Sequence, residues 1–158
     1  DWIAARPAQA RFEGEVLLVH GSPRSDIDYL LERVEPDGPR PSLTAEVAPV
    51  LAGIDARLVL CGHTHVPRAL RLDDGRLCVN PGSVGLPAFR GSHPYPHVMQ
   101  SGTPAARYAM LHRDSGTWGA ELIAVEYNHA AAVERARGRG FDAWADALRD
   151  GRLPLAPA

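Results

Sequence analysis

Two short, continuous apolar runs in the first half of the chain predict buried β-strands. One covers residues 15–19 and the other residues 58–61, and each contains four successive apolar positions. This continuity is typical of strands covered on both faces, whereas a half-exposed strand alternates apolar and polar residues. An amphipathic stretch over 26–34, a Pro- and Gly-rich connector over 36–41 and a helical pattern over 42–52 separate the two runs. The order therefore predicts a strand, helix, strand unit.

Two hairpins are predicted further along the chain. The Asp-Gly pair at 74–75 separates the strand-like runs 68–72 and 76–79, and Asp-Gly between such runs is a strong hairpin signal. A Ser-Gly turn likewise separates the runs 108–112 and 121–127. We therefore expect a meander of antiparallel strands after the parallel part.

The remaining segments predict helices and irregular structure. Residues 130–148 have a helical pattern with a break at 138–140, and residues 1–11 are typical of a helix end or linker. Residues 85–104 are rich in Gly, Pro and Ser, which predicts a long irregular surface loop. We expect an α/β fold with a mixed sheet, formed by residues 1–158 as a single domain.

Composition and charge exclude several classes of protein. The 158 residues are 45% apolar and 23% charged, as in ordinary globular domains, which argues against a disordered or collagen-like chain. A net charge of -2 predicts no nucleic acid or anionic lipid as a partner. No apolar stretch approaches the ~20 residues of a membrane span, so no membrane association is expected. The two cysteines stand in apolar runs, and we expect a cytoplasmic location.

Histidines follow both of the buried strand runs. His20 comes after the first, and His63 and His65 lie in the Gly-His-Thr-His segment after the second. Ligands of open α/β sheets bind at the carboxyl ends of strands, and neutral imidazole is the commonest protein ligand of transition metals. These three residues therefore predict a metal site. Cys61 and Cys78 could instead join the Gly-His-Thr-His histidines in a structural zinc site, but the spacing matches no common zinc finger.

Three motifs carry a resemblance to a known family. Residues 17–23 read Leu-Leu-Val-His-Gly-Ser-Pro, residues 61–67 read Cys-Gly-His-Thr-His-Val-Pro, and residues 79–85 read Val-Asn-Pro-Gly-Ser-Val-Gly. In order and spacing they resemble the last three motif blocks of the calcineurin-like metallophosphoesterases, close to the small bacterial phosphodiesterase-type members. The resemblance spans about residues 15–111.

The resemblance implies a fold, a cofactor and a reaction. The family fold is a sandwich of two mixed β-sheets flanked by helices, with two divalent metal ions (Mn, Fe, Zn, Ni or Mg) bridged by an Asp and a hydroxide. By position His20 and His63 would bind one ion, and His65 the other. The implied reaction is hydrolysis of a phosphodiester or a small phosphomonoester by the metal-bound hydroxide. A diadenosine tetraphosphatase-like role stays open.

The turn after the third strand is a candidate substrate contact. Asn80, Gly82 and Ser83 belong to it, and its backbone amides could face a substrate phosphate. A purely structural turn is an equally good interpretation of the same residues.

The family's Asp-containing blocks and its catalytic histidine have no counterpart before His20. Asn128 and His129 are no substitute, because they follow the other blocks and lack the flanking Gly and acid. Asn128 is predicted to cap the helix that follows. We therefore expect the chain to be the C-terminal half of such an enzyme, inactive alone, with an N-terminal half or a companion chain supplying the remaining ligands. Association into a homo-oligomer is a further expectation.

Other polar residues have simpler explanations, and one other class of function stays open. Asp26 and Asp28 are predicted as first-turn helix residues, and His93 and His97 as flexible surface histidines that could add a ligand or substrate contact. The alternative function is a non-catalytic scaffold that keeps the fold and binds protein partners.

Overall fold

A five-stranded mixed sheet forms the centre of the molecule. The computed structural model describes residue 2 and residues 5–155. The strands are β1 Gln9–Phe12, β2 Val16–Val19, β5 Leu58–Leu60, β6 Arg68–Arg71 and β7 Leu77–Asn80. Their order across the sheet is β1-β2-β5-β7-β6. The three inner strands run parallel, and each outer strand pairs antiparallel with its neighbour. The two predicted buried strands and the Asp-Gly hairpin are confirmed.

Both faces of the inner strands are covered, which explains their continuous apolar sequences. On one face Leu17, Val59 and Cys78 lie side by side in register and join a buried cluster with Val47 and Leu51. Residues of the opposite face form a second buried cluster: Val16, Leu58, Leu77 and Val79. Burial of such side chains contributes roughly 1.5–3 kcal/mol each, so this sheet is the stable base of the fold.

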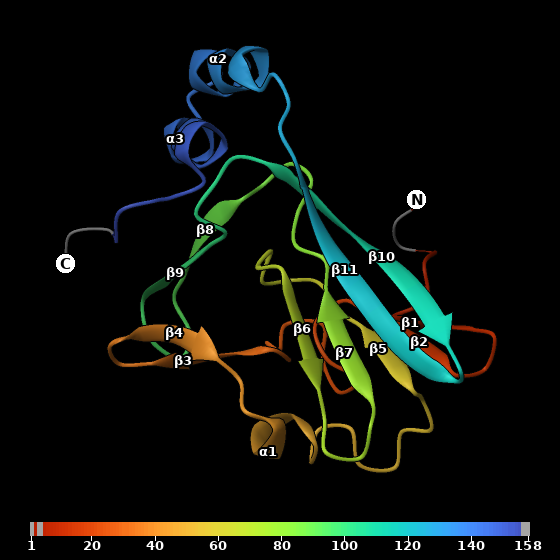
Figure 1. Ribbon diagram of the computed structural model, residues 1–158. Helices are drawn as coiled ribbons and strands as arrows, with labels where there is room; N and C mark the ends of the chain where they lie inside the picture. Colours follow the sequence, from red (N-terminus) through yellow and green to blue (C-terminus); the bar gives the residue numbers. More distant parts are fainter. Residues whose placement is uncertain (1, 3–4, 156–158) are drawn as a thin grey trace.

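A long hairpin forms a second layer over that opposite face. It consists of β10 Ala106–Asp114 and β11 Thr117–Val125, joined by the predicted Ser115–Gly116 turn. Alternate side chains of the hairpin, among them Leu111 and Trp118, contact the second cluster. Figure 1 shows the hairpin crossing the sheet. The predicted α/β fold is confirmed, with a two-stranded second layer in the part of the chain that the structure describes.

The segment between β2 and β5 differs from the prediction. Residues 26–34 form turns and then β3 Glu32–Glu35, which pairs with β4 Gly38–Pro41 in the segment expected to be a connector. The physical reason is tertiary: Glu32 is held by Arg68 of β6, with Nε and Oε1 2.8 Å apart. Asp26 and Asp28 therefore do not open a helix, and Asp28 accepts a hydrogen bond from the Ser22 hydroxyl at 2.8 Å.

The helix predicted over 42–52 is much shorter in the structure. α1 covers Thr44–Val47 and continues as turns to residue 53. Pro49 explains the early end, because proline lacks the N–H that would bond to the preceding turn of a helix.

Three further strands arise where a loop or a linker was predicted. Residues 85–104 contain a hairpin of β8 Ala88–Gly91 and β9 His97–Gln100, and the predicted linker contains the edge strand β1. Ala88 is buried against Ala147 and Leu153 near the end of the chain. Contacts with a segment remote in sequence therefore stabilise a hairpin that the local composition does not favour.

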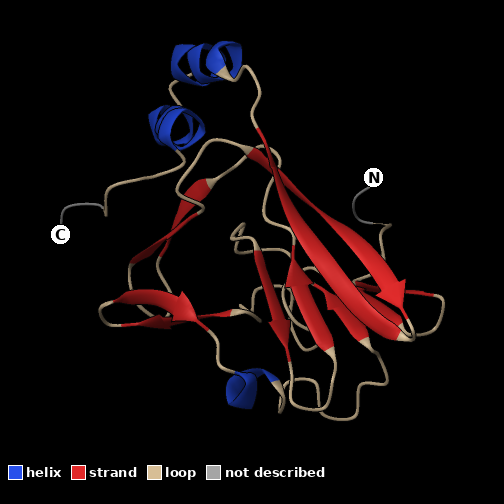
Figure 2. Cartoon of the chain, in the orientation of Figure 1, coloured by secondary structure: helices blue, strands red, loops and turns tan. Residues whose placement is uncertain are grey.

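The C-terminal helices agree with the prediction. α2 covers Ala130–Gly138 and α3 covers Asp142–Asp150, with the break where the sequence placed it. Figure 2 shows these helices outside the two sheet layers, with α3 next to β8. The capping residue is His129, one position later than predicted, although the Asn128 side chain accepts a hydrogen bond from the Ala130 N–H at 3.2 Å. Among the described residues no helix has both the length and the apolar character that crossing a membrane requires.

Candidate functional site

His20 and His63 meet at the carboxyl ends of two neighbouring strands. His20 directly follows β2, and His63 lies in the loop after β5, which pairs parallel with β2. The Gly62 N–H donates a hydrogen bond to the His20 carbonyl at 2.8 Å, which joins the two loops. The imidazole rings are tilted toward each other with centroids 4.9 Å apart. The structure therefore brings two of the three predicted ligands into one pair.

The Gly-His-Thr-His loop has an unusual backbone conformation. His63 has φ 63° and His65 has φ 59°, both in the left-handed region that residues with a side chain rarely adopt. Each such residue costs on the order of 1–3 kcal/mol, and such residues cluster at functional sites. Surrounding contacts must therefore hold this loop in place.

Asn80 provides those contacts from the end of β7. Its amide nitrogen donates to the Gly62 carbonyl at 2.7 Å and to the Thr64 hydroxyl at 2.9 Å, and its amide oxygen accepts from the Gly82 N–H at 2.9 Å. Ser83 accepts a hydrogen bond from the Leu86 N–H at 3.0 Å. Asn80 therefore holds the Gly-His-Thr-His loop, and contact of Asn80, Gly82 and Ser83 with a substrate stays a prediction.

His65 is held by contacts of its own. Its Nδ1 lies 2.8 Å from the Leu86 carbonyl, and because a carbonyl only accepts, Nδ1 carries the proton and Nε2 has its lone pair free. Its ring packs edge to face on Phe89, with centroids 5.2 Å apart. A fixed Nδ1–H with a free Nε2 is the usual arrangement of a metal-ligating histidine.

Burial lowers the pKa of His63 and, to a lesser extent, the neighbouring His20 ring acts in the same direction. Burial is also the main cause that lowers the pKa of His65. Both effects disfavour the charged imidazolium and leave neutral rings, the form that binds metal.

The imidazole donors of these histidines are of a type that binds divalent metals. They are too few to complete the coordination of a metal ion. Imidazole suits Zn, Fe and Ni, whereas hard ions such as Mn and Mg, and paired ions, also need carboxylates. Among residues 2 and 5–155 no group of three or more His, Cys, Asp or Glu side chains is placed to hold one ion. The alternative zinc site is not assembled either, because Cys61 and Cys78 are free thiols within the apolar core. Burial raises the pKa of Cys78 to about 12.

Tyr29 was not among the residues predicted for the site, and His97 lies in a different environment from the predicted one. His97 was expected to be a flexible surface residue, yet it is only 2% exposed. Its Nδ1 lies 2.7 Å from the Tyr95 carbonyl, so Nδ1 donates there and Nε2 accepts from the Tyr29 hydroxyl at 3.2 Å. The Tyr29 ring in turn lies 5.1 Å from the His63 ring. His93 is exposed, as predicted.

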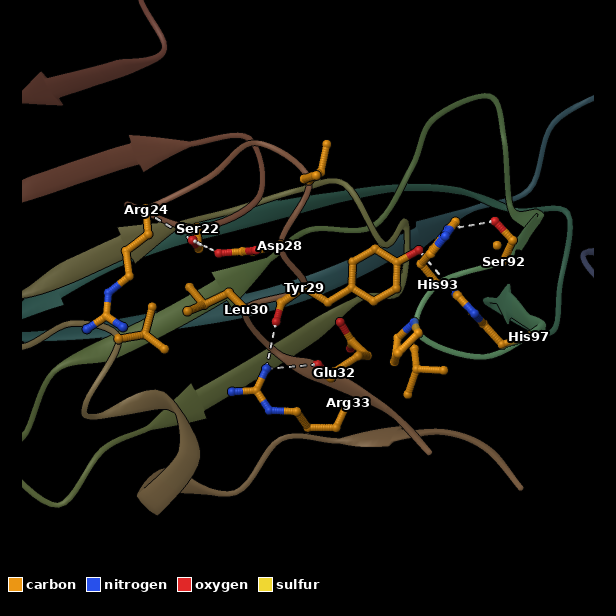
Figure 3. Close-up of a pocket in the computed structure, with 15 residues that line it drawn as sticks. Ser22, Arg24, Asp28, Tyr29, Leu30, Glu32, Arg33, Ser92, His93 and His97 are labelled. Atoms are coloured by element: carbon orange, nitrogen blue, oxygen red, sulfur yellow. Dashed lines mark hydrogen bonds between the residues drawn. The ribbon is translucent and has the colours of Figure 1, made fainter. Parts of the chain in front are cut away.

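A groove of about 800 Å³ opens beside this chain of contacts, and Tyr29, His93 and His97 line it (Figure 3). Burial and the nearby Glu32 carboxylate raise the pKa of Tyr29. No sequence motif predicts the groove, because it forms between two segments that are remote in sequence, the turns before β3 and the β8–β9 hairpin. In the sequence, only the two histidines of the 93–97 segment, His93 and His97, could have indicated this groove.

The chain is similar to one known protein family and to solved structures. Residues 5–101 match the family model described as the calcineurin-like phosphoesterase superfamily domain. A search of curated proteins finds no match. The chain is similar to a metallophosphoesterase from Sphaerobacter thermophilus, with 24% identity and a TM-score of 0.70 over 96% of this chain and 62% of that one.

A second solved structure, a hypothetical protein from Pyrococcus horikoshii, has 20% identity and a TM-score of 0.66. The similarity covers 97% of this chain and 54% of that one. At these identities the likeness shows a shared fold. The chain spans less than two thirds of the length of either protein.

Proposed function

Because the chain belongs to the calcineurin-like phosphoesterase superfamily, we propose that it is the C-terminal half of a metal-dependent phosphoesterase that hydrolyses phosphodiesters or small phosphomonoesters. The family resemblance of the three motifs is confirmed. The observation that carries the proposal is the His20–His63 pair, with rings 4.9 Å apart at the carboxyl ends of β2 and β5.

The histidines have distinct roles in this proposal. His20 and His63 hold one divalent ion, and His65 holds a second through its free Nε2 while the Leu86 carbonyl fixes the ring. When bound, such a pair of ions supplies an activated nucleophile and neutralises the charge that develops on the phosphate. Asn80 acts as a positioning residue, because it fixes the loop that carries two of these histidines.

Carboxylate donors complete the site from outside this sequence, either in the same protein or in a companion chain. The described residues place no carboxylate with the imidazole pair in a group of three donors. Bridging two ions requires charged oxygen ligands, which imidazole cannot replace. The chain alone is accordingly expected to hydrolyse nothing measurable. We also propose that the protein is located in the cytoplasm.

The test uses the intact protein, which is this chain together with the part that supplies the carboxylates. Its hydrolysis of bis(p-nitrophenyl) phosphate is measured with added Mn²⁺. His63→Ala and His65→Ala are expected to reduce kcat by at least ~100-fold and to lower the bound metal measured by mass spectrometry. His112→Ala is the matched control, because His112 is exposed on β10. Full activity in both ligand variants, or a metal-independent rate, would contradict the proposal.

A scaffold function is the second candidate, and the surface of α2 and α3 favours it. Phe141 and Trp144 are 59% and 49% exposed and line an apolar groove of about 310 Å³ between the two helices. Under this alternative, Trp144→Ala abolishes binding of a purified protein partner while His65→Ala leaves it unchanged. Loss of phosphoesterase activity in His65→Ala, with no partner found, would favour the enzyme.

A further inference from the structure

The groove of about 800 Å³ adjoins the proposed metal pair through Tyr29. Tyr29 lines the groove, and its ring lies 5.1 Å from the ring of His63. Ser22, two residues after His20, lines the groove as well. Figure 3 shows the Tyr29 ring in the middle of the groove with its hydroxyl directed toward His97. Pockets of ~300–1,000 Å³ hold drug-sized organic molecules, and a phosphate group alone is far smaller.

The wall of the groove is fixed rather than formed by a loose loop. The Tyr29 hydroxyl donates to His97 of the β8–β9 hairpin at 3.2 Å, which ties two segments remote in sequence across the groove. Gly91 lies against the His97 ring so closely that a Cβ at this position would overlap it. The absence of a side chain at Gly91 therefore allows the histidine to reach the tyrosine.

Charges along the groove are balanced and largely occupied by protein contacts. Arg33 donates to the Tyr29 carbonyl at 3.0 Å and to the Glu46 carbonyl at 3.2 Å, and Arg24 donates to the Pro49 carbonyl. Two acidic side chains, Asp28 and Glu32, also line the groove. A surface that recognises a polyphosphate chain instead presents free guanidinium or ammonium groups.

Glu32 indicates that the ligand carries hydrogen-bond donors. The side chain is buried, and Arg68 holds its Oε1, while Oε2 has no hydrogen-bond partner among the described residues. A buried acceptor without a partner is costly, so a donor on a bound molecule would stabilise it. Apolar side chains such as Ile27, Leu30 and Pro94 line the same groove and suit a ring system.

We propose that this groove binds the organic substituent of the phosphoester, a neutral, ring-bearing group with hydroxyl or amino donors and about the size of a nucleoside. The proposal rests on the proposed function and narrows it: the substrate carries a large organic group, and neither a small phosphomonoester nor a polyphosphate chain fills the groove. Tyr29 and His97 position the wall on which the ring lies.

Calorimetric titration of the intact protein in the presence of Mn²⁺ tests the proposal without relying on turnover. The probes are adenosine 5′-monophosphate, inorganic phosphate and tripolyphosphate. We expect adenosine monophosphate to bind at least ~10-fold more tightly than inorganic phosphate, because only the nucleoside reaches the groove. Ile27→Trp places a bulky ring at a groove position where the native side chain is 80% exposed, so the variant should fold.

Ile27→Trp is expected to weaken binding of adenosine monophosphate at least ~10-fold and to leave inorganic phosphate unchanged. Met110→Trp is the matched control, because Met110 is 55% exposed on β10 and does not line the groove. The proposal would be overturned if adenosine monophosphate and inorganic phosphate bound with equal affinity, or if Ile27→Trp left the affinity for adenosine monophosphate unchanged. Tighter binding of tripolyphosphate than of adenosine monophosphate would also overturn it.

The two proposals fail in different ways. If the intact protein hydrolyses no phosphoester while Ile27→Trp still weakens nucleotide binding, the proposed reaction is wrong and the groove assignment stands. If hydrolysis is metal-dependent and Ile27→Trp alters neither nucleotide binding nor kcat/KM for a nucleoside phosphodiester, the groove assignment is wrong and the reaction stands.

Discussion

Asn80 shows how one residue can organise a site without necessarily touching a ligand. It is fully buried, and its side chain bonds the loop after β5 and the turn after β7 at once. The sequence predicted the residue as a substrate contact, and this role stays a prediction. Its partners, Gly62 and Thr64, became visible only in the structure, since they are sixteen or more positions away along the chain.

Gly82 in the same turn provides a test of this arrangement. It has φ +92°, and a Cβ there would lie 2.9 Å from the Arg107 Cβ. Gly82→Ala should therefore lower the free energy of unfolding by about 1–3 kcal/mol, measured by urea denaturation. Gly85→Ala is the control, because a Cβ at Gly85 meets no atom within 4 Å, and we expect a change within about 0.5 kcal/mol. Equal effects of the two substitutions would contradict this account of the turn.

At the scale of elements, side-chain ion pairs hold together what the local sequence left weak. Arg40 of β4 forms a bidentate contact with Glu46 of α1, at 2.9 and 2.8 Å, and also bonds Glu35 of β3 at 2.6 Å. Glu46 additionally accepts from the Leu43 N–H at 2.7 Å, at the start of α1. The β3–β4 hairpin has few apolar residues, so no pattern predicted it, whereas its charged residues find partners only in the folded chain.

This network predicts a pH dependence of stability. The hydrogen bonds from Arg40 and then from the Leu43 N–H lower the pKa of Glu46 from 4.5 to about 2. A carboxyl whose pKa is lower in the folded state stabilises the fold above its unfolded pKa, and the stabilisation is lost as the pH falls from 4.5 toward 2. Glu46→Gln should therefore lower the Tm at pH 7, and the difference from the native protein should disappear by about pH 2.

Thermal unfolding followed by circular dichroism over this pH range measures the effect. Glu121→Gln is the control, because Glu121 is exposed on β11 and is in no ion pair among the described residues. A Tm difference for Glu46→Gln that persists unchanged at pH 2 would show that the residue acts through packing and not through its charge.

For the whole molecule, the decisive feature is the layering of the β10–β11 hairpin on the central sheet. The hairpin covers the face formed by Val16, Leu58 and their neighbours, while Phe12 and Leu18 near the β1 edge remain 58% and 37% exposed. The second layer thus covers only part of the sheet within the described residues. Association through the uncovered part stays a prediction.

Two adjacent residues of β10 test the layering. Leu111 contacts the buried cluster of the sheet, whereas Met110 points to the opposite side and is 55% exposed. Leu111→Ala should lower the free energy of unfolding by about 2 kcal/mol, because it leaves a gap between the layers. Met110→Ala should change it by less than about 0.5 kcal/mol. The comparison uses equilibrium denaturation, and similar losses in both variants would argue against this packing.

Local sequence patterns were sufficient to predict the parallel strands, the two hairpins with Gly turns and the C-terminal helices, and they singled out the three candidate histidines. Each of these predictions depends on a pattern that spans only a few residues: a continuous apolar run, an Asp-Gly or Ser-Gly turn, or a Gly-flanked histidine after a strand. Long-range contacts, in contrast, produce the β3–β4 and β8–β9 hairpins, the burial of His97 and the groove beside Tyr29. These features depend on contacts such as Tyr29 with His97, 68 residues apart, and such contacts leave no periodic pattern in the chain.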